Sequence, residues 1–438
     1  MNRFFPDAGR LYSAEFAADP HGVYQVLRAQ HGTVAPVEIA PGIGAHLVLG
    51  YRAALEVLDD RSGNWSKDPR PWQATLPDTP AARGLMGMIG WRPNVLFSDG
   101  AAHRRYRQVV TDCLAMVPPY RLRALVMEIC DALIREFAVT GSADLVDQYA
   151  QQIPLRLFNR LFGRPDQDSA ELIAALKGLL NATPETGEAA NAAFGQYMSD
   201  LLHSKYQEPG QDLTSWIIQH PAALTPDEGL HTVILLLGAA FEPLLNLIVN
   251  AIARVVSDPR YHASLSDGAL TTYDALQEVL RDDPSMANYG PYFVLQPTDF
   301  HGTWIRPAEL VLVSYAAANT EPAAGLDHQG ERSDSGAHLG FGAGPHRCPA
   351  ADPALLIAGA AIDRILTLLP GMRLAAEPGA LTWRPGPFHR ALSALPVTFR
   401  PIRPDQPGDN PWNSRTNSTP SDATSQEKPR PCAHAATS

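Results

Sequence analysis

Residues 338–366 read HLGFGAGPHRCPAADPALLIAGAAIDRIL and place one cysteine, Cys348, between a glycine-rich turn and an apolar helical pattern. Three residues before the cysteine allow the backbone to fold closely around its sulfur: Phe341, Gly342 and Gly344. The pattern predicts a single thiolate presented to a metal. The alternative is a structural cysteine in an ordinary glycine-rich loop.

Positive charge accompanies this sulfur in the sequence. His346 and Arg347 precede Cys348, and a predicted helix that begins after Pro349 points the positive end of its dipole at the anion. Both effects favour the thiolate over the thiol, so the segment indicates a sulfur prepared as an anionic ligand.

The segment resembles the Phe-Gly-x-Gly-x-His-x-Cys signature of the cytochrome P450 superfamily, the haem-thiolate oxygenases. The residues in register are Phe341, Gly342, Gly344, His346 and Cys348. The resemblance implies a cytochrome P450 fold and a haem b cofactor (iron protoporphyrin IX), with Cys348 as the ligand that pushes electron density towards dioxygen. It also implies that Phe341, Gly342 and His346 contact the haem.

The composition is that of a globular protein. Of its 438 residues 45% are apolar and 18% are charged, and the net charge is −11. No basic block or aromatic-basic stripe appears, which argues against a nucleic-acid partner. The four cysteines show no paired spacing, so a reducing cytoplasm fits better than a disulfide framework.

The N-terminal 20 residues show neither a signal peptide nor a membrane anchor, because they are polar and interrupted by proline. The longest apolar run, VILLLGAAF at 233–241, is too short to span a bilayer. We therefore expect a soluble, monomeric, cytoplasmic protein with no membrane partner.

Helical periodicity dominates the chain from about residue 20 to about residue 401. The predicted helices cover 21–29, 53–59, 101–115, 120–138, 148–161, 170–180, 189–206, 230–256 and 273–281. The β-like runs lie near the two ends of the chain, at 34–39, 45–50, 292–295, 310–314 and 391–399. This predicts a mainly α protein with a small β region assembled from distant segments, which is the layout that the resemblance implies.

We expect one haem-thiolate oxygenase domain over residues 1–403. Residues 404–438 are rich in Pro, Ser and Thr and lack apolar periodicity, so they cannot bury a core and should form a disordered tail.

Glu278 and Arg281 lie three residues apart on a helical pattern, so their side chains share a face and can pair. A solvated surface pair is the ordinary interpretation of such spacing. The resemblance implies instead the buried structural Glu-x-x-Arg pair of the family, at the family's order and approximate distance before Cys348. In the family a loop arginine completes this network, and Arg332 is the candidate here.

A second pair, His103 and Arg107, lies four residues apart on a predicted helix. The resemblance implies that both donate to haem propionates, and an exposed basic helix surface is the alternative. Arg104 and Arg105 should point elsewhere, to solvent or to an acidic redox partner. Where related sequences often carry a propionate-binding arginine, this chain has Tyr292, which donates a hydrogen bond without charge.

The segment LLLGAAFEPLLNLIVNAI, residues 235–252, is similar to the long helix that crosses the distal haem face in the family. Family members usually have an acid followed by an alcohol there; this chain keeps the acid, Glu242, and has Pro243 in place of the alcohol. Proline inside a helix removes one amide donor and leaves the carbonyl of Ala239 free, so the helix should kink. The alternative, that Pro243 ends one helix and starts another, is disfavoured by the apolar periodicity that continues through Val256.

The missing hydroxyl leaves three routes by which protons can reach the distal side. Glu242 acts through ordered water, an OH or NH group of the substrate relays the proton, or peroxide is the natural oxidant. Within the family, members that lack the alcohol include biosynthetic enzymes that couple aromatic rings, which is an association at family level.

The same register predicts a substrate pocket. Its distal lining should be Gly238, Ala239, Phe241 and Pro243, and its border Met286, Ala287 and Asn288. Residues 64–93 lie where the family places its variable substrate-covering loop. Aromatic and sulfur side chains there suit a flat, nitrogen-rich ligand, namely Trp65, Trp72, Met86 and Trp91, although packing within the loop is the alternative role of each tryptophan. The small residues at 238–240 leave room for a bulky substrate.

Together these features predict a haem-thiolate oxidase acting on an aromatic or peptide-derived natural product, with electrons from a ferredoxin and its reductase. The substrate radical would couple to a second ring, or, in the alternative, undergo regioselective hydroxylation. An alternative of another class is a non-catalytic haem-binding accessory or sensor protein, which the missing alcohol and the replaced arginine leave open.

Overall fold

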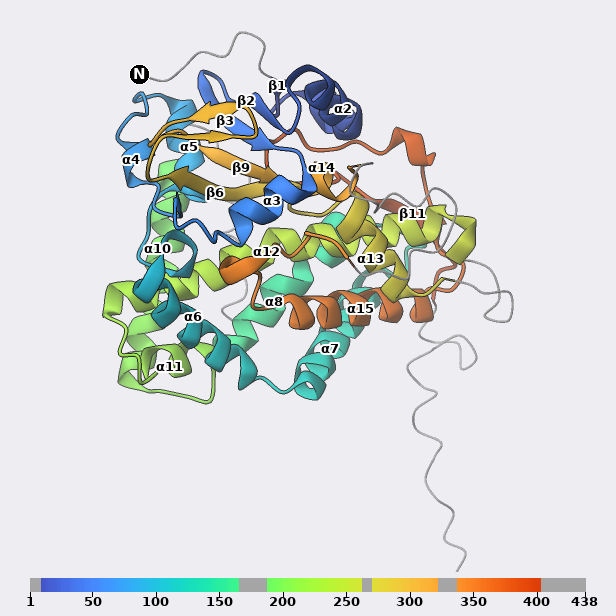
Figure 1. The fold of residues 1–438 in the computed structure, drawn as a ribbon. Coiled ribbons are helices and arrows are strands. Elements are labelled where there is room, and N and C mark those ends of the chain that lie inside the picture. The colour runs from blue at the N-terminus through green and yellow to red at the C-terminus, as the bar shows by residue number, and fades with distance from the viewer. Residues whose placement is uncertain (1–8, 165–186, 262–269, 322–336, 403–438) are drawn as a thin grey trace, which may run out of the picture.

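The computed structural model describes residues 9–164, 187–261, 270–321 and 337–402. The predicted helix at 170–180, the predicted tail at 404–438 and Arg332 lie outside these ranges. In Figure 1 the labelled strands β1, β2, β3, β6 and β9 gather at one side of the molecule, and most of the long helices lie at the other. This confirms the prediction of a mainly α protein with a small β region.

Long helices form the larger part of the molecule. They are α6 (Gly100–Ala115), α7 (Pro119–Phe137), α8 (Gln152–Leu161), α10 (Gly187–Gln207), α12 (Pro226–Ser257), α13 (Thr272–Asp282) and α15 (Ala351–Leu368). α12 packs against α8, α13 and α15, and α15 packs against α7, so these helices share one core. The start of α12 is set by local chemistry, because Thr225 and Glu228 form a capping box around Pro226 at the first helical position.

The shorter helices are α1 (Ala14–Ala18), α2 (Pro20–His31), α3 (Tyr51–Leu58), α4 (Arg70–Gln73), α5 (Pro80–Ile89), α11 (Leu213–Ile218) and α14 (Tyr315–Asn319). Single turns of 3₁₀ helix are η1 (Val95–Phe97), η4 (Pro259–Tyr261), η7 (Gly344–His346) and η8 (Pro378–Ala380), and η2 (Val146–Ala150) is a π turn. Two of these helices, α4 and α5, fall within the predicted loop at 64–93. Thr79 caps α5 by accepting from the amide of Ala82, a local signal that the sequence interpretation did not use.

The main sheet has the order β1 (Gly9–Arg10), β2 (Val34–Ala40), β3 (Ile43–Val48), β9 (Val311–Ser314), β6 (Asn288–Val294) and β4 (Trp65–Ser66). β3 and β9 are parallel, so residues 46–48 lie beside 311–313, and the predicted assembly from distant segments is confirmed. A three-stranded sheet joins β10 (Arg373–Leu374), β11 (Pro396–Thr398) and β5 (Ser142–Asp144). β7 (Thr298–Phe300) and β8 (Thr303–Ile305) form a separate hairpin.

α12 is long and apolar enough, by length and composition, to cross a membrane, and 56% of its most apolar window is buried inside the structure. The apolar run at 233–241, which the sequence analysis judged too short to span, lies inside this 32-residue helix. Packing against α8, α13 and α15 is the arrangement of a core helix that is apolar on most of its faces.

Candidate active site

The cysteine loop folds back on itself. The amide of Cys348 donates to the carbonyl of Phe341 at 2.9 Å and closes the turn. Within the turn, Gly342 and Gly344 have φ angles of +68° and +64°. A Cβ atom at Gly344 would also overlap the carbonyl oxygen of Leu58 at the end of α3, so glycine is required there.

The charge around Cys348 differs from the prediction. Burial raises the pKa of the Cys348 thiol, and the amide of Ala350 and the guanidinium groups of Arg107 and Arg347 offset this only in part. The predicted cation His346 is neutral, because burial and neighbouring cations lower its pKa to about 2. Since a metal cation deprotonates a thiol that coordinates it, the thiolate state depends on the metal more than on the loop's own charge.

α6 brings two predicted residues to this loop. The ring centroids of His103 and His346 lie 4.0 Å apart, and Nη1 of Arg107 donates to the carbonyl of Arg347 at 2.6 Å. His103 is 6% exposed, and its Nε2 atom has no hydrogen-bond partner among the described residues. The expected shared face of His103 and Arg107 is therefore present, and it meets the cysteine loop instead of forming an exposed basic surface.

Arg105 on the same helix has a different role from the one predicted. It pairs in bidentate fashion with Glu228, at 2.8 and 3.0 Å, and donates to the carbonyls of Ala222 and Ala223. The prediction that Arg105 faces solvent or a redox partner is wrong, because it ties α6 to the start of α12. Arg104 is exposed.

Tyr292 and a buried lysine lie next to this cluster. Tyr292 is 3% exposed, and its hydroxyl has no hydrogen-bond partner among the described residues. The ammonium of Lys67, which is 2% exposed, lies 4.0 Å from the centre of the Tyr292 ring. Buried polar atoms are almost always paired, so the unpaired atoms of His103 and Tyr292 fit a bound group that carries acceptors. Haem propionates are such acceptors, and the residues present therefore fit a haem beside Cys348.

α12 is unbroken through Pro243, so the alternative that this proline separates two helices is wrong. In the middle of this largely buried helix, Gly238 and Ala239 are exposed, and a Cβ atom at Gly238 would meet no atom of the described residues within 4 Å. Phe241, by contrast, is 4% exposed and packs in the main core, which corrects its predicted place in the pocket lining. The open stretch at 238–239 is the candidate distal surface.

Glu242 is held by the segment that precedes β11. The guanidinium of Arg384 pairs with its carboxylate, and Nδ1 of His389 lies 3.9 Å from Oε2. Burial alone would raise the pKa of Glu242, but His389 and Arg384 outweigh it and the pKa lies below its ordinary value. Burial also lowers the pKa of His389. Of the two residues that contact Glu242, Arg384 is therefore the one that stays positively charged. Sequence reasoning missed Arg384 and His389, since 142 residues separate Arg384 from Glu242 and no local pattern connects them.

The two tryptophans predicted to contact substrate are packing residues. Trp65 meets Phe300 and Tyr292 edge-on, with ring centroids 5.1 and 6.4 Å apart. Trp72 is 1% exposed and packs on Phe293 with ring centroids 6.1 Å apart. The packing alternative is the correct one for both. Of the three tryptophans in the predicted loop, Trp91 is the exposed one, at 39%.

Asn288 is also a structural residue. It is fully buried, accepts from the hydroxyl of Tyr24 at 2.9 Å and donates to the carbonyl of Pro387 at 2.9 Å. Its amide is therefore occupied within the protein, and the prediction of a substrate contact is wrong.

The remaining predicted pocket residues divide between packing and the distal side. Met86 of α5 packs against the buried apolar residues around the main sheet, and Ala287 is 5% exposed. Met286 is partly buried and forms an isolated β-bridge with His389. The amide of Ala287 donates to the carbonyl of Phe388 at 2.8 Å, so Met286 and Ala287 both pair with the segment that contacts Glu242.

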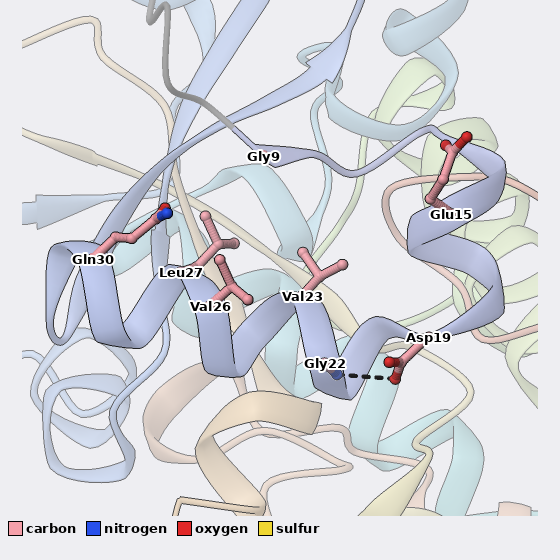
Figure 2. A pocket seen from close by; sticks show the side chains of 8 residues that line it. All are labelled: Gly9, Glu15, Asp19, Gly22, Val23, Val26, Leu27 and Gln30. Carbon is pink, nitrogen blue, oxygen red and sulfur yellow. Dashed lines mark hydrogen bonds between the residues drawn. The ribbon is translucent and has the colours of Figure 1, made fainter.

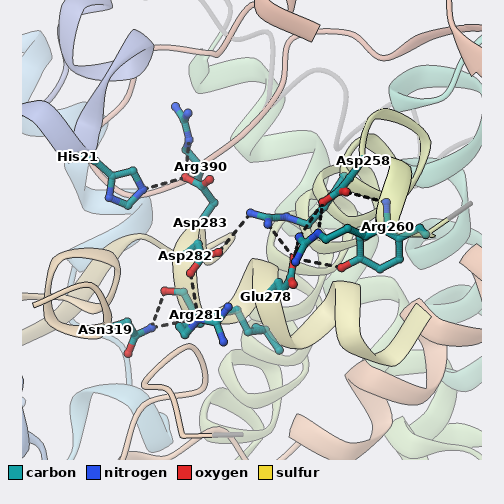
Figure 3. Close-up of polar contacts among 12 residues, drawn as sticks. His21, Asp258, Arg260, Glu278, Arg281, Asp282, Asp283, Asn319 and Arg390 are labelled. Atoms are coloured by element: carbon teal, nitrogen blue, oxygen red, sulfur yellow. Dashed lines mark hydrogen bonds and ion pairs between the residues drawn. The ribbon is translucent and has the colours of Figure 1, made fainter. Parts of the chain in front are cut away.

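Glu278 is paired, but not with the predicted partner. Figure 3 shows the polar contacts around it: the donors to Oε2 of Glu278 are Arg254, Arg260 and Tyr261, at 2.8, 3.0 and 3.1 Å. Nε of Arg281 donates instead to Asp282 at 3.0 Å. The structural role of Glu278 is thus to tie α13 to α12 and η4, and the predicted Glu278–Arg281 pair is not formed.

A hollow of about 480 Å³ lies between β1 and the helices α1 and α2 (Figure 2). Its lining is Gly9, Glu15, Asp19, Gly22, Val23, Val26, Leu27 and Gln30. The carboxylate of Asp19 caps α2 by accepting from the amide of Gly22 at 2.9 Å. The hollow contains none of the predicted site residues, so the chemistry belongs to the cysteine loop and α12.

No protein-family model matches the chain. Cytochrome P450 monooxygenase PikC from Streptomyces venezuelae is 34% identical over 403 residues, which cover 90% of this chain and 94% of that protein. Mycinamicin IV hydroxylase/epoxidase from Micromonospora griseorubida is 30% identical over 399 residues, covering 87% and 97%. The solved structure of CYP154C4 from Streptomyces sp. W2061 has a TM-score of 0.79 at 24% identity, covering 90% of this chain and 98% of that one, and shows the same fold.

Proposed function

The chain belongs to the cytochrome P450 monooxygenases, and we propose that it inserts oxygen into a bulky natural product. The observation that carries the proposal is the cysteine loop with unpaired, buried donor atoms at its side. That arrangement suits a large planar cofactor with carboxylates at its edge, held by one sulfur ligand.

The cofactor is haem, and we propose haem b. Cys348 would ligate the iron. The residues that would surround the group are His103, Arg107, Tyr292, Phe341, Gly342 and His346. When bound, a thiolate-ligated haem supplies the activation of dioxygen.

The distal residues position and exchange a proton. Arg384 keeps Glu242 ionised and fixes its carboxylate, while the buried imidazole of His389 lies next to it. Pro243 offers no hydroxyl, so the proposed proton path runs through Glu242, His389 and ordered water or substrate. Pro243 has no amide hydrogen to donate to the carbonyl of Ala239, so this carbonyl can accept a hydrogen bond from a substrate or water.

The proposed substrate is bulky. Support comes from the exposed Gly238 and Ala239, where the helix presents no side chain larger than a methyl group. Relatives named for their substrates include a 6-deoxyerythronolide B hydroxylase and a 2-hydroxy-5-methyl-1-naphthoate 7-hydroxylase. The structure gives no preference for an aromatic substrate, because Trp65 and Trp72 pack within the protein.

A ferredoxin with its reductase is the proposed electron source, for a monomeric enzyme of the bacterial cytoplasm. The globular unit would span residues 1–403, with 404–438 as a tail. The exposed Arg104 on α6, the helix that carries Arg107 to the cysteine loop, would meet an acidic partner at the proximal side.

Oxidative coupling of aromatic rings is the second candidate reaction. It is favoured by Pro243 in place of the alcohol, since coupling removes hydrogen from the substrate and inserts no oxygen. Pro243 and Tyr292 also leave the accessory or sensor role as the alternative of another class.

The test is turnover of defined natural products by the purified holoprotein with a surrogate ferredoxin and reductase. Mycinamicin IV, 6-deoxyerythronolide B and 2-hydroxy-5-methyl-1-naphthoate are the first probes, because relatives are named for them. A product heavier by one oxygen supports hydroxylation, and loss of two hydrogens per new bond supports coupling. Turnover of any probe excludes the accessory role.

The ligand assignment has its own measurement. The reduced, carbon monoxide-treated wild type should show the absorption band of thiolate-ligated haem, and Cys348→Ala should lose it. If Cys348→Ala keeps the band, another residue is the ligand. Cys113→Ala is the matched control, because that buried cysteine of α6 should leave the band unchanged.

A further inference from the structure

Lys67 is a buried cation without a counter-ion. Its side chain is 2% exposed, and within the described ranges no carboxylate lies within 4.0 Å of its ammonium. An unpaired buried ammonium is strongly unfavourable, so a structure that keeps one usually supplies an anion from elsewhere.

Asp99 is the acid whose charge acts on Lys67, but its carboxylate is bound to other donors. Its carboxylate accepts from the hydroxyl of Ser66 at 2.6 Å and from the backbone amide of Lys67 at 3.0 and 3.1 Å. Burial lowers the pKa of Lys67 to about 7, and the charge of Asp99 offsets this only in part. The ammonium itself contacts the face of Tyr292.

The other side chains next to Lys67 carry hydrogen-bonding groups and no negative charge. The Tyr292 ring contacts Lys67 and meets His346 edge-on, with ring centroids 6.5 Å apart, and the His346 ring lies 4.0 Å from that of His103. The hydroxyl of Tyr292 and Nε2 of His103 have no partner in the described part of the chain. These groups form a buried cluster with one ammonium, and one of them, His346, lies two residues before Cys348 in the chain. A carboxylate is the kind of group that such a cluster binds.

Strand pairing explains how Lys67 reaches this position. β4 and β6 are antiparallel, with Trp65 opposite Val294 and Ser66 opposite Phe293. Continuing that register places position 67 opposite position 292. The ammonium of Lys67 therefore lies directly across the ladder from the unpaired hydroxyl-bearing ring of Tyr292.

We infer that Lys67 binds a haem propionate, together with the hydroxyl of Tyr292 and the imidazole of His103. The inference rests on haem being the cofactor of this chain. Lys67 is a positioning residue for the cofactor, and it supplies the positive charge that Tyr292 on the neighbouring strand lacks.

The test measures haem release from the holoprotein to excess apomyoglobin. Loss of a charge-assisted hydrogen bond should accelerate release from Lys67→Met by roughly 10- to 100-fold, because such bonds contribute about 1.5–3 kcal/mol and 1.4 kcal/mol corresponds to tenfold. Lys67→Arg, which keeps the charge, should stay within about threefold of wild type. Reconstitution with haem dimethyl ester, whose carboxylates are blocked, should abolish the difference between wild type and Lys67→Met.

Lys205→Met is the matched control, because Lys205 is a partly buried lysine of α10 whose partner, Asp212, lies at 2.8 Å. It should lower the melting temperature and leave native haem release unchanged. Equal release from wild type and Lys67→Met, or an equal effect with the dimethyl ester, overturns the inference. If Lys67→Met does not fold, Lys67→Gln takes its place, and release as slow as that of Lys67→Arg overturns the inference.

The outcomes separate this inference from the proposed function. A wild-type protein without the thiolate–haem band overturns both. A normal band with haem release that does not depend on Lys67 overturns the role of Lys67 alone.

Discussion

Gly344 fixes the position of the sulfur against α3. Its φ angle of +64° disfavours any side chain, and the carbonyl of Leu58 fills the space where a Cβ atom would lie. The glycine therefore does two things at once: it permits the turn and lets the loop touch α3. The second of these is what holds Cys348 in place relative to the rest of the fold.

Gly344→Ala should abolish the absorption band of thiolate-ligated haem. The matched control is Gly371→Ala, because Gly371 has a φ of +77° but open space around its Cα atom. Both variants carry left-handed strain of about 1–2 kcal/mol, so both should melt a few degrees lower. A Gly344→Ala protein with a normal band would show that contact with Leu58 is not needed for ligation.

At the scale of the element, α12 combines a core helix with an opening. Its C-terminal half, from Leu244 to Ile252, is buried on nearly every face, whereas Gly238 and Ala239 are exposed. Pro243 lies where the two halves meet and removes the amide that would bind the carbonyl of Ala239. The helix thus has a weakened hydrogen-bond ladder next to its open stretch.

Pro243→Thr should raise the free energy of unfolding by about 2 kcal/mol, because a proline in a helix interior costs about 3 kcal/mol relative to alanine and threonine costs less than 1. The restored hydroxyl should also increase product formed per electron consumed. Chemical denaturation and the ratio of product to NADH check the two effects. Pro226→Thr, at the exposed first position of the same helix where proline is tolerated, is the control and should change neither. If electron use and product type stay constant in Pro243→Thr, the absent hydroxyl does not limit turnover.

At the scale of the whole molecule, the two ends of the chain are joined by polar contacts. Asn288 binds both Tyr24 and the carbonyl of Pro387, and Arg390 binds both Asp283 and the carbonyl of Ala17. His21 of α2 completes this junction by pairing with Asp283 at 3.4 Å (Figure 3).

This junction should give the protein a stability maximum in mildly acidic solution. Asp283 raises the pKa of His21 above its ordinary 6.5. The stability that the His21–Asp283 pair contributes is therefore complete below pH 6.5, and it is lost as the pH rises through the pKa of His21 in the folded protein. Burial opposes ionisation of Asp283, but His21 and Arg390 outweigh it and lower its pKa below 3.8, so its contribution is lost as the pH falls through the folded value. Melting temperatures between about pH 3 and pH 9 test this.

The variant His21→Gln should remove the decrease in melting temperature above about pH 6.5, and it should weaken the acid limb, because Arg390 is then the remaining cation that holds the pKa of Asp283 down. His301→Gln is the control, since His301 also pairs with a carboxylate, that of Glu56 at 3.0 Å, but in an exposed hairpin. An unchanged pH profile in His21→Gln would assign the alkaline limb to other groups.

Local patterns predicted the parts of the site that lie within one element. The cysteine loop, the shared face of His103 and Arg107, and the course of α12 through Pro243 each follow from spacing of a few residues. The predicted partner of Glu278 was wrong because its actual partner, Arg254, lies on another helix, which spacing within one helix does not indicate.

Other features could not be predicted because they depend on contacts between distant segments. Lys67 gains its significance from the pairing of β4 with β6, and Arg384 from its approach to Glu242. Trp65 and Trp72 illustrate a different limit. A tryptophan in a loop sequence looks the same whether it lines a pocket or packs inside the protein.

The junction between the chain ends also constrains how the protein is made. Arg390 and Ala17 are 373 residues apart in the sequence, and at about 5–20 residues per second a ribosome needs roughly 20–75 s to synthesise that interval. During this time β2 and β3 exist without their partner β9, with an unpaired strand edge that invites aggregation. Cys348 can ligate haem only after it has been synthesised, when about one seventh of residues 1–403 remains to be made. Supply of chaperones and haem late in translation should therefore govern the yield of active protein in a recombinant host.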